Sequence, residues 1–303
     1  MTPLRLGYLG LAVPDPDAWA PFAHEVLECG YREPTGPMPA QIVLDDDRPA
    51  IFLERSPETD VRFLGWEFPD HATATDRVRR LTELGIEVVP GPDTVRQSRR
   101  VDGLWSFDDP FGYRHEIYFG PHRRLRTLPS QLGHPELGHA FLLVGDPAEA
   151  EEFFGEGLGL PISDRISFTM GATPFEPGDV PVDVSFLLAH HRHHVLAVAG
   201  LPDGGPTRGL AHIMIEVDSL DEVGKAYDAC LDRDLLVTTI GRHTNDEVVS
   251  FYLSAPGGVV IEFGCGGRPA DPGPHSIPRY DAPSLWGHRP YKPTPETHPA
   301  HAE

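Results

Sequence analysis

Apolar and polar residues follow one another along this chain in short runs that recur in the same order. Apolar runs typical of strands, such as "LGYLGLAV" from residue 6 and "LGHAFLLV" from residue 137, are each followed by a turn containing Asp and Pro. About ten residues with helical periodicity then follow and end at Gly. The later strands are joined by tight turns, "DDPFG" and "APGG", which favour hairpins over parallel crossovers. The pattern predicts an α+β fold built from short strands and short helices.

The order of these runs repeats within the chain. Residues 5–31 align with 136–160, and residues 63–89 align with 209–238. Such self-similarity indicates repeated structural units. We predict four βαβββ units, at about 5–55, 61–120, 137–200 and 209–266, paired into two domains that span residues 1–120 and 137–267. Residues 121–136 are predicted to be a linker, and the Pro- and His-rich residues 268–303 a mostly irregular tail.

Aligning the repeats makes three strand positions comparable between the two halves. The second half has His139, His212 and Glu262 there, and the first half has Tyr8, Trp66 and Glu116. The last two positions are equally far apart in both halves, which supports this alignment.

An ionised Glu262 between apolar neighbours is costly unless it has a partner. Two imidazoles and one carboxylate can bind one face of a divalent metal and leave its other positions open. A single strand His is more often a hydrogen-bonded core residue, and a single strand Glu usually faces water. Because three such residues share repeat-equivalent positions, we favour a metal site in the second half. Glu116, without histidines, is predicted to be a structural remnant that binds no metal.

Composition narrows the possible partners. The formal charge of −21 argues against nucleic acid, whose binders concentrate Lys and Arg. Cys29, Cys230 and Cys265 form no CxxC pattern, so we expect buried free thiols rather than disulfides or a zinc site. The chain shows no secretory signal pattern and no apolar run long enough to cross a membrane. We therefore expect a soluble cytoplasmic protein with no membrane partner.

Two long stretches carry a specific resemblance. "HIMIEVDSLDEVGKAYD" from residue 212 and "GRHTNDEVVSFYLSAPGGVVIEFG" from residue 241 resemble two-domain type I extradiol ring-cleavage dioxygenases of the vicinal oxygen chelate superfamily. The likeness runs from "LGYLGLAV" to "SLWGH" at 284–288. It implies two vicinal-oxygen-chelate domains, with a metal only in the second one. The ion would be Fe(II), or alternatively Mn(II), bound by His139, His212 and Glu262, with O2 as co-substrate and a small-molecule catechol as substrate.

The same resemblance implies roles for residues around the metal. The strand "HHRHHVLAVAG" at 190–200 matches a paired-histidine strand whose second member, His194, is the acid–base residue. His243 and Tyr252 match groups that hydrogen-bond the bound catechol and oxygen. Asn245 and Asp246 match polar residues that support this shell.

Further residues bear on the substrate pocket. Phe141, Phe186 and Met170 would surround a bulky apolar substituent, although such residues are also common in plain cores. The resemblance, in which the positions of Phe141 and Phe186 line the ring pocket, implies proximal extradiol cleavage of a 3-substituted, aryl or polycyclic catechol to a product of the muconate-semialdehyde type. Residues 161–185 match the family poorly. The neighbouring His190, His191 and His193 are predicted to be solvent-facing residues of an edge strand, and His190 departs from the Asn that is usual there.

Two other functions stay open. One is a non-oxidative metalloenzyme of the same fold, such as a glyoxalase or an epimerase, although these typically add another carboxylate to the site. The other is a metal-free small-molecule binding protein, which would have no use for the three ligand residues. A homo-oligomer is expected from the resemblance, with exposed strand edges and the apolar "SLWGH" pointing the same way.

Overall fold

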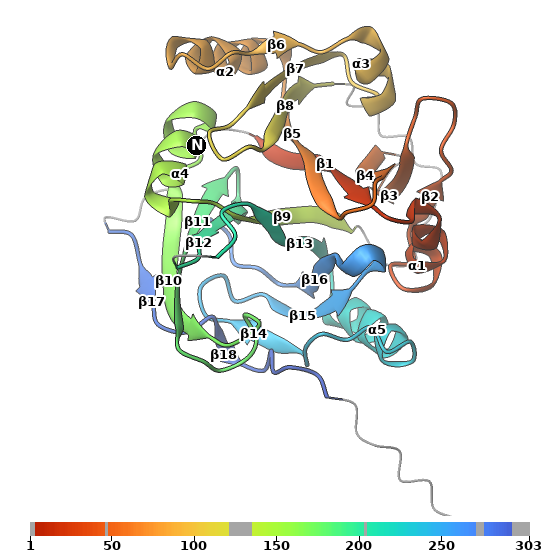
Figure 1. Cartoon of the computed structure of the whole chain (residues 1–303), viewed down its shortest axis with the longest axis vertical. Coiled ribbons are helices and arrows are strands. Elements are labelled where there is room, and N and C mark those ends of the chain that lie inside the picture. The colour runs from red at the N-terminus through yellow and green to blue at the C-terminus, as the bar shows by residue number, and fades with distance from the viewer. Residues whose placement is uncertain (1–3, 46–47, 121–134, 203–204, 271–275, 293–303) are drawn as a thin grey trace, which may run out of the picture.

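The structure is a computed structural model that describes residues 4–45, 48–120, 135–202, 205–270 and 276–292. Its strands form two curled sheets, one from each half of the chain (Figure 1). The first sheet contains β1 (Arg5–Val13), β2 (Gly30–Arg32), β3 (Ala40–Asp45), β4 (Arg48–Arg55), β5 (Asp60–Phe68), β6 (Val89–Pro90), β7 (Gly103–Asp108) and β8 (Arg114–Phe119). The helical segments of this half are η1 (Pro16–Ala18), α1 (Trp19–Glu25), α2 (His71–Glu83) and α3 (Asp93–Arg99).

The second sheet repeats the arrangement of the first. It contains β9 (Glu136–Leu143), β10 (Ile162–Met170), β11 (Val180–Ala189), β12 (Arg192–Gly200), β13 (Gly209–Val217), β14 (Gly241–His243), β15 (Val249–Ser254), β16 (Val260–Cys265), β17 (Arg279–Tyr280) and β18 (Ser284–Trp286). Its helical segments are α4 (Pro147–Phe153), η2 (Phe154–Leu158), α5 (Leu220–Leu231) and η3 (Pro256–Gly258).

Strand order confirms the predicted fold class of repeated βαβββ units. The first sheet runs β2-β3-β4-β1-β5-β8-β7-β6, and the second runs β10-β11-β12-β9-β13-β16-β15-β14 between two added edge strands. In both sheets the first strand of one unit pairs antiparallel with the first strand of the next. Helix α3 is an addition to the second unit. The predicted linker lies almost entirely outside the described residues, and β9 begins at its last residue.

The tail contributes strands where we predicted mostly irregular structure. β17 pairs with β10, and β18 pairs with β14. These short strands add hydrogen-bond partners at both ends of the second sheet, where an uncovered edge would expose unpaired backbone groups.

The two halves share one apolar core. A single cluster of buried side chains includes Leu11 and Trp66 from the first half and Ile213 and Phe263 from the second. Tyr113 links the halves further, because its hydroxyl donates to the carbonyl of Leu143 at 2.6 Å. The second sheet is therefore supported from one side by the first domain.

Strand register corrects one of the repeat equivalences. Glu262 lies opposite the residue two positions after His212, and Glu116 lies opposite the residue two positions after Phe63. The counterpart of His212 is therefore Phe63, and the predicted equivalence with Trp66 is wrong. Trp66 packs in the shared core, on the other side of the sheet from Phe63. The equal number of residues from Trp66 to Glu116 and from His212 to Glu262 was misleading, because the segments that connect these strands differ in length between the two halves.

Four aromatic rings fill the inside of the first sheet. These rings belong to Tyr8, Phe52, Phe63 and Tyr118, and by strand register the second sheet has His139, Ala197, His212 and Gly264 at the same positions. Small and polar side chains thus replace bulky apolar ones. Among the described residues, the second copy therefore has smaller side chains and two histidines where the first copy has a packed aromatic cluster.

Glu116 has its own cation in the first half. The buried Arg99 guanidinium, supplied by α3, donates from Nε and Nη2 to the two carboxylate oxygens of Glu116 at 3.0 and 3.2 Å. It also lies 3.9 Å from the ring centre of Phe63 and 4.4 Å from that of Phe52. Breaking such a buried pair typically costs about 3–5 kcal/mol. Arg99 therefore balances the Glu116 carboxylate without a metal.

Candidate metal centre and active site

The three predicted metal ligands come from three neighbouring central strands, β9, β13 and β16. His139 Nε2 and His212 Nε2 lie 3.0 Å apart. Glu262 Oε2 lies 3.4 Å from the first nitrogen and 3.3 Å from the second. The structure thus gathers the three predicted donor atoms into one small triangle.

The size of this triangle suits one metal ion. Ligand atoms about 2.1 Å from an ion, at right angles to one another, lie about 3.0 Å apart. Three protein donors would leave the other positions of such an ion open, as in a facial triad. His139, His212 and Glu262 could therefore hold a divalent metal without rearrangement of the strands.

The protonation of these groups also suits a cation. Burial lowers the pKa of His139 to about 4, although Glu262 partly opposes this. Burial raises the pKa of Glu262, but the neighbouring His243, His139 and His212 outweigh it and hold that pKa well below its usual value. A neutral imidazole and an ionised carboxylate are the forms that bind metal.

The second oxygen of Glu262 is held away from the two histidines. Ser250 Oγ donates to Oε1 at 2.7 Å, and His243 Nε2 lies 3.0 Å from it. Burial lowers the pKa of His243, but the Glu262 carboxylate, Asp246 and the Pro283 carbonyl together outweigh burial and raise that pKa to about 9. Tyr252 OH lies 3.1 Å from the same His243 nitrogen. Burial and Glu262 raise the pKa of Tyr252 well above its usual value, so the phenol stays a donor.

His194 lies beside the triangle without belonging to it. Its ring centre is 4.1 Å from that of His139 and 4.9 Å from that of Phe186. Burial, with His139 and His193, lowers the pKa of His194 well below its usual value. The side chain is therefore a neutral imidazole next to the candidate metal position.

The prediction for His193 is wrong. Strand β12 lies between β11 and β9, so it is not an edge strand, and His193 is buried. Its Nε2 lies 2.9 Å from Oδ2 of the fully buried Asp164. Asn245 donates to the other oxygen of that carboxylate at 3.1 Å. Only His190 and His191, in the turn before β12, are exposed as predicted.

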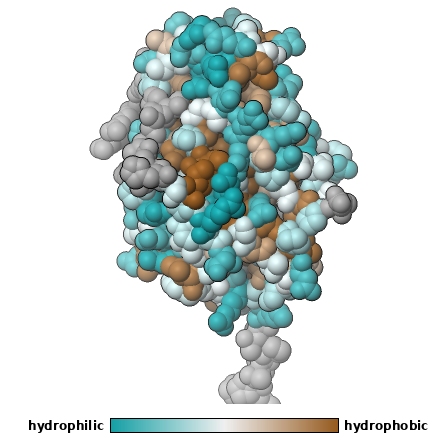
Figure 2. All heavy atoms as spheres, turned by 90° about the vertical axis from the view of Figure 1, so that its left-hand side faces the viewer, coloured by the Kyte–Doolittle hydropathy of each residue, from teal (hydrophilic) through white to brown (hydrophobic). Residues whose placement is uncertain are grey.

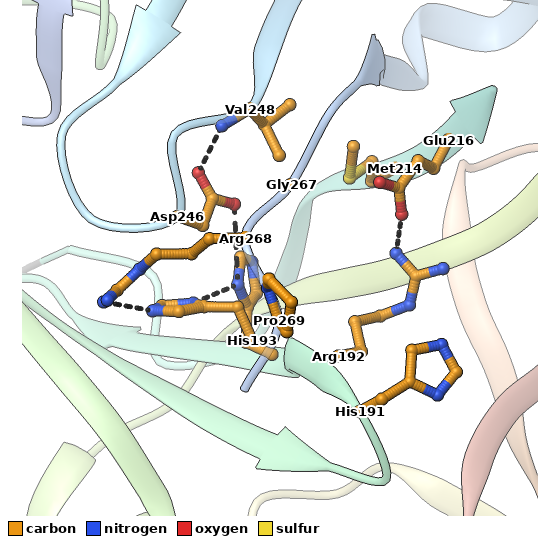
Figure 3. A pocket seen from close by; sticks show the side chains of 11 residues that line it. His191, Arg192, His193, Met214, Glu216, Asp246, Val248, Gly267, Arg268 and Pro269 are labelled. Carbon is orange, nitrogen blue, oxygen red and sulfur yellow. Dashed lines mark hydrogen bonds and ion pairs between the residues drawn. The ribbon is translucent and has the colours of Figure 1, made fainter. Parts of the chain in front are cut away.

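A second group of metal-binding side chains adjoins a pocket. His193, His194 and Asp246 offer three close donors, and they line a cavity of about 220 Å³ whose mouth includes exposed residues. Figure 3 shows His193, Asp246 and Arg268 on one side of this pocket and Arg192 on the other. Arg268 lies 3.2 Å from His193 Nε2, and this positive charge disfavours a second cation. We therefore place no second metal in this group.

Apolar side chains form one wall near the candidate ligands. The predicted pocket residues Phe141, Phe186 and Met170 belong to one cluster, which surrounds buried residues of β11 and β12. The ring of Phe141 lies 5.3 Å from that of His212. Figure 2 views the face where β10 and β17 lie and shows a group of hydrophobic residues among hydrophilic ones.

Three residues of this region were not predicted from the sequence. Ser250 contacts Glu262, and the buried His288 of the tail contacts Ser250. Phe175, in the poorly matched segment between β10 and β11, places its ring 4.5 Å from that of Tyr252. The sequence offered one signal for Ser250, its position two residues before the predicted site residue Tyr252. It offered no such signal for His288 and Phe175, which have no counterpart in the repeat.

Comparison with known proteins agrees with this class of fold and site. The family model of the glyoxalase/bleomycin resistance protein/dioxygenase superfamily matches residues 5–117 and again residues 136–263. The chain belongs to this superfamily. Named relatives within it are extradiol catechol dioxygenases.

Individual relatives cover almost the whole chain. A biphenyl-2,3-diol 1,2-dioxygenase of Metapseudomonas furukawaii is 38% identical over 293 residues, 94% of this chain and 93% of its own. An iron-dependent extradiol dioxygenase of Rhodococcus jostii is 32% identical and covers 93% of this chain and 96% of its own. The solved structure of a halotolerant catechol dioxygenase has a TM-score of 0.82 and 29% identity, and the match covers 95% of both chains.

Among the described residues, every helix is too short or too polar to span a bilayer. All three cysteines are free and buried, as the sequence predicted.

Proposed function

We propose that this chain uses iron(II) and O2 to cleave the ring of a catechol that carries an aryl or polycyclic group beside the diol. The observation that carries the proposal is the triangle of His139, His212 and Glu262. Its donor spacing of 3.0–3.4 Å matches one ion with open positions. These three residues would hold the iron, which would supply a common binding site for the catechol and O2 and a path for electron transfer between them. Both oxygen atoms end in the ring-opened product, so no further reductant is needed.

The surrounding side chains would manage protons and charge. His194, neutral and next to the open positions, would take a proton from the substrate and return it to the product. Tyr252 would donate a hydrogen bond to a catechol oxygen. His243 would stabilise negative charge that develops nearby, since Glu262 favours its protonated form.

The apolar wall supports the choice of substrate. Phe141 and Phe186 flank His212 and His194 respectively, and Met170 extends the same cluster. A bulky apolar substituent at the carbon next to the diol would bury its surface there. Asn245 and Asp246 would act indirectly, because Asn245 bonds to Asp164 and Asp246 lies 3.8 Å from His194 Nδ1.

Anaerobic reconstitution followed by a substrate panel tests this function. We expect metal-free protein to take up a single Fe(II) per chain and, in air, to convert biphenyl-2,3-diol to a yellow ring-opened product. The kcat/KM for this substrate should exceed that for unsubstituted catechol, because the apolar wall would remain unfilled by the smaller ring.

Each alternative gives a different result in that experiment. Binding of catechol without any metal would identify a small-molecule binding protein. Metal uptake without O2 consumption would identify a non-oxidative metalloenzyme. Intradiol products, or two irons per chain, would contradict the proposed reaction and site.

We further propose that the protein acts as a homo-oligomer in the cytoplasm. Free buried thiols suit a reducing compartment. Leu285 and Trp286 on the outermost strand are 59% and 52% exposed, which suits a covered surface. Light scattering at micromolar concentration should give a multiple of the 33.3 kDa chain mass; a monomer at that concentration would contradict the proposal.

A further inference from the structure

Residues 279–291, which we call the C-terminal strap, join the two ends of the second sheet. β17 pairs with β10 near one end, and β18 pairs with β14 at the other. The strap continues along the sheet, where Tyr291 N donates to Val237 O at 2.8 Å. Four residue steps from Tyr280 to Ser284 span at most roughly 15 Å. The curled sheet therefore brings its two ends close together, and the strap crosses between them.

The strap delivers His288 to a buried chain of hydrogen bonds that ends on Glu262. Ser284 Oγ lies 2.7 Å from His288 Nδ1. His288 Nε2 lies 3.1 Å from both the hydroxyl and the carbonyl oxygen of Ser250. The Ser250 hydroxyl in turn donates to Glu262 Oε1 at 2.7 Å.

One assignment of protons satisfies the whole chain. Ser284 donates to Nδ1 of a neutral His288, whose Nε2–H donates to the Ser250 carbonyl. The Ser250 hydroxyl is then free to donate to Glu262. Burial favours this neutral form, since it lowers the pKa of His288 to about 3.

The strap backbone is shaped to bring His288 into this position. Gly287 and His288 both have positive φ, at 76° and 46°, a conformation that is unfavourable for a residue with a side chain. A Cβ on Gly287 would lie 2.1 Å from the carbonyl oxygen of Ile240. A Cβ on Gly241 would likewise lie 2.5 Å from the backbone nitrogen of His288. Two glycines therefore permit the close approach of strap and sheet.

We propose that His288 is a positioning residue of the metal site, which acts through Ser250 to fix the Glu262 carboxylate with Oε2 toward the two imidazoles. The inference rests on the metal site of the proposed function. A carboxylate can rotate and present either oxygen, or both, to an ion. Holding Oε1 by hydrogen bonds leaves Oε2 as the ligand. Loss of such supporting bonds typically lowers metal affinity about 10- to 100-fold.

Metal titration of two matched variants tests the proposal. In His288→Gln the side-chain amide can place a donor where Nε2–H was, near Ser250. In His288→Asn the shorter amide can still contact Ser284 but does not reach Ser250. Anaerobic titration of metal-free protein with Fe(II), and with Co(II) followed by its absorption spectrum, gives the affinity and the ligand geometry. We expect His288→Asn and His288→Ala to lose about 10- to 100-fold in affinity, and His288→Gln to lose less.

Gly287→Ala extends the test without changing a polar group. Because its Cβ displaces the strap, we expect a similar loss of affinity, whereas Asp281→Asn, at an exposed strap position, should bind metal like the wild type. Thermal unfolding of the metal-free variants verifies that each chain is folded. Wild-type affinity and an unchanged Co(II) spectrum in His288→Asn and His288→Ala would overturn the role of His288. Failure of the wild type to bind metal would overturn the proposed function itself.

Discussion

Replacing His212 with alanine should abolish stable metal binding and, with it, all ring cleavage. His212 supplies one of three donor atoms, and its Nε2 lies 3.0 Å from His139 Nε2 and 3.3 Å from Glu262 Oε2. Among the described residues, the other nearby imidazoles are already placed: His194 packs against His139, and His243 contacts Oε1 of Glu262. Either one would have to leave these contacts to replace the lost donor.

The loss of metal affinity in His212→Ala should exceed the roughly 10- to 100-fold loss that is typical when a supporting hydrogen bond is removed. Iron per chain after anaerobic reconstitution measures it directly, together with O2 uptake in the presence of catechol. His24→Ala, an exposed histidine of the first domain, is the matched control and should keep wild-type iron content. A folded His212→Ala protein that retains iron would show that the ion is held by other residues.

Local patterns were sufficient to predict the fold. Alternating apolar strands, Gly-terminated helical segments and tight turns are properties of short segments, and their repetition gave the unit order that the sheets show. The repeat also brought His139 and Glu262 to attention, because strands at equivalent positions of a repeated unit place their side chains alike.

Register could not be predicted in the same way. Side chains alternate between the two faces of a strand, so an odd shift of position moves a residue to the other face. Trp66 lies three positions after Phe63, the true counterpart of His212. The equal sequence distances from Trp66 to Glu116 and from His212 to Glu262 could not reveal this shift, because the loops between the strands also differ in length.

Long-range contacts were equally hidden in the sequence. His288 follows a Pro-rich segment without periodicity, and its role depends on the strap crossing the curled sheet. His193 was mistaken for an exposed residue because sequence cannot tell whether a strand is at the edge or inside a sheet. Its partner Asp164 lies on β10, two strands away, and is fully buried.

Replacing His194 with alanine should leave metal binding near normal and slow catalysis about 10²- to 10⁴-fold. His194 is outside the donor triangle, so its loss removes no ligand. It is a buried neutral imidazole whose ring lies 4.1 Å from that of His139. His194 also lines the cavity beside Asp246. A neutral base at this position can accept a substrate proton and later return it.

The expected loss corresponds to about 3–5 kcal/mol of transition-state stabilisation. It should appear in kcat, while catechol still binds to the iron-loaded variant, because ligands and apolar wall are unchanged. Anaerobic substrate binding, iron content and steady-state rates over a range of pH together separate the possible roles. An iron-free His194→Ala protein, under conditions that fill the wild type, would make His194 a ligand. A wild-type rate would assign proton transfer to another group, and His243, which contacts both Glu262 and Tyr252, would be the next residue to replace.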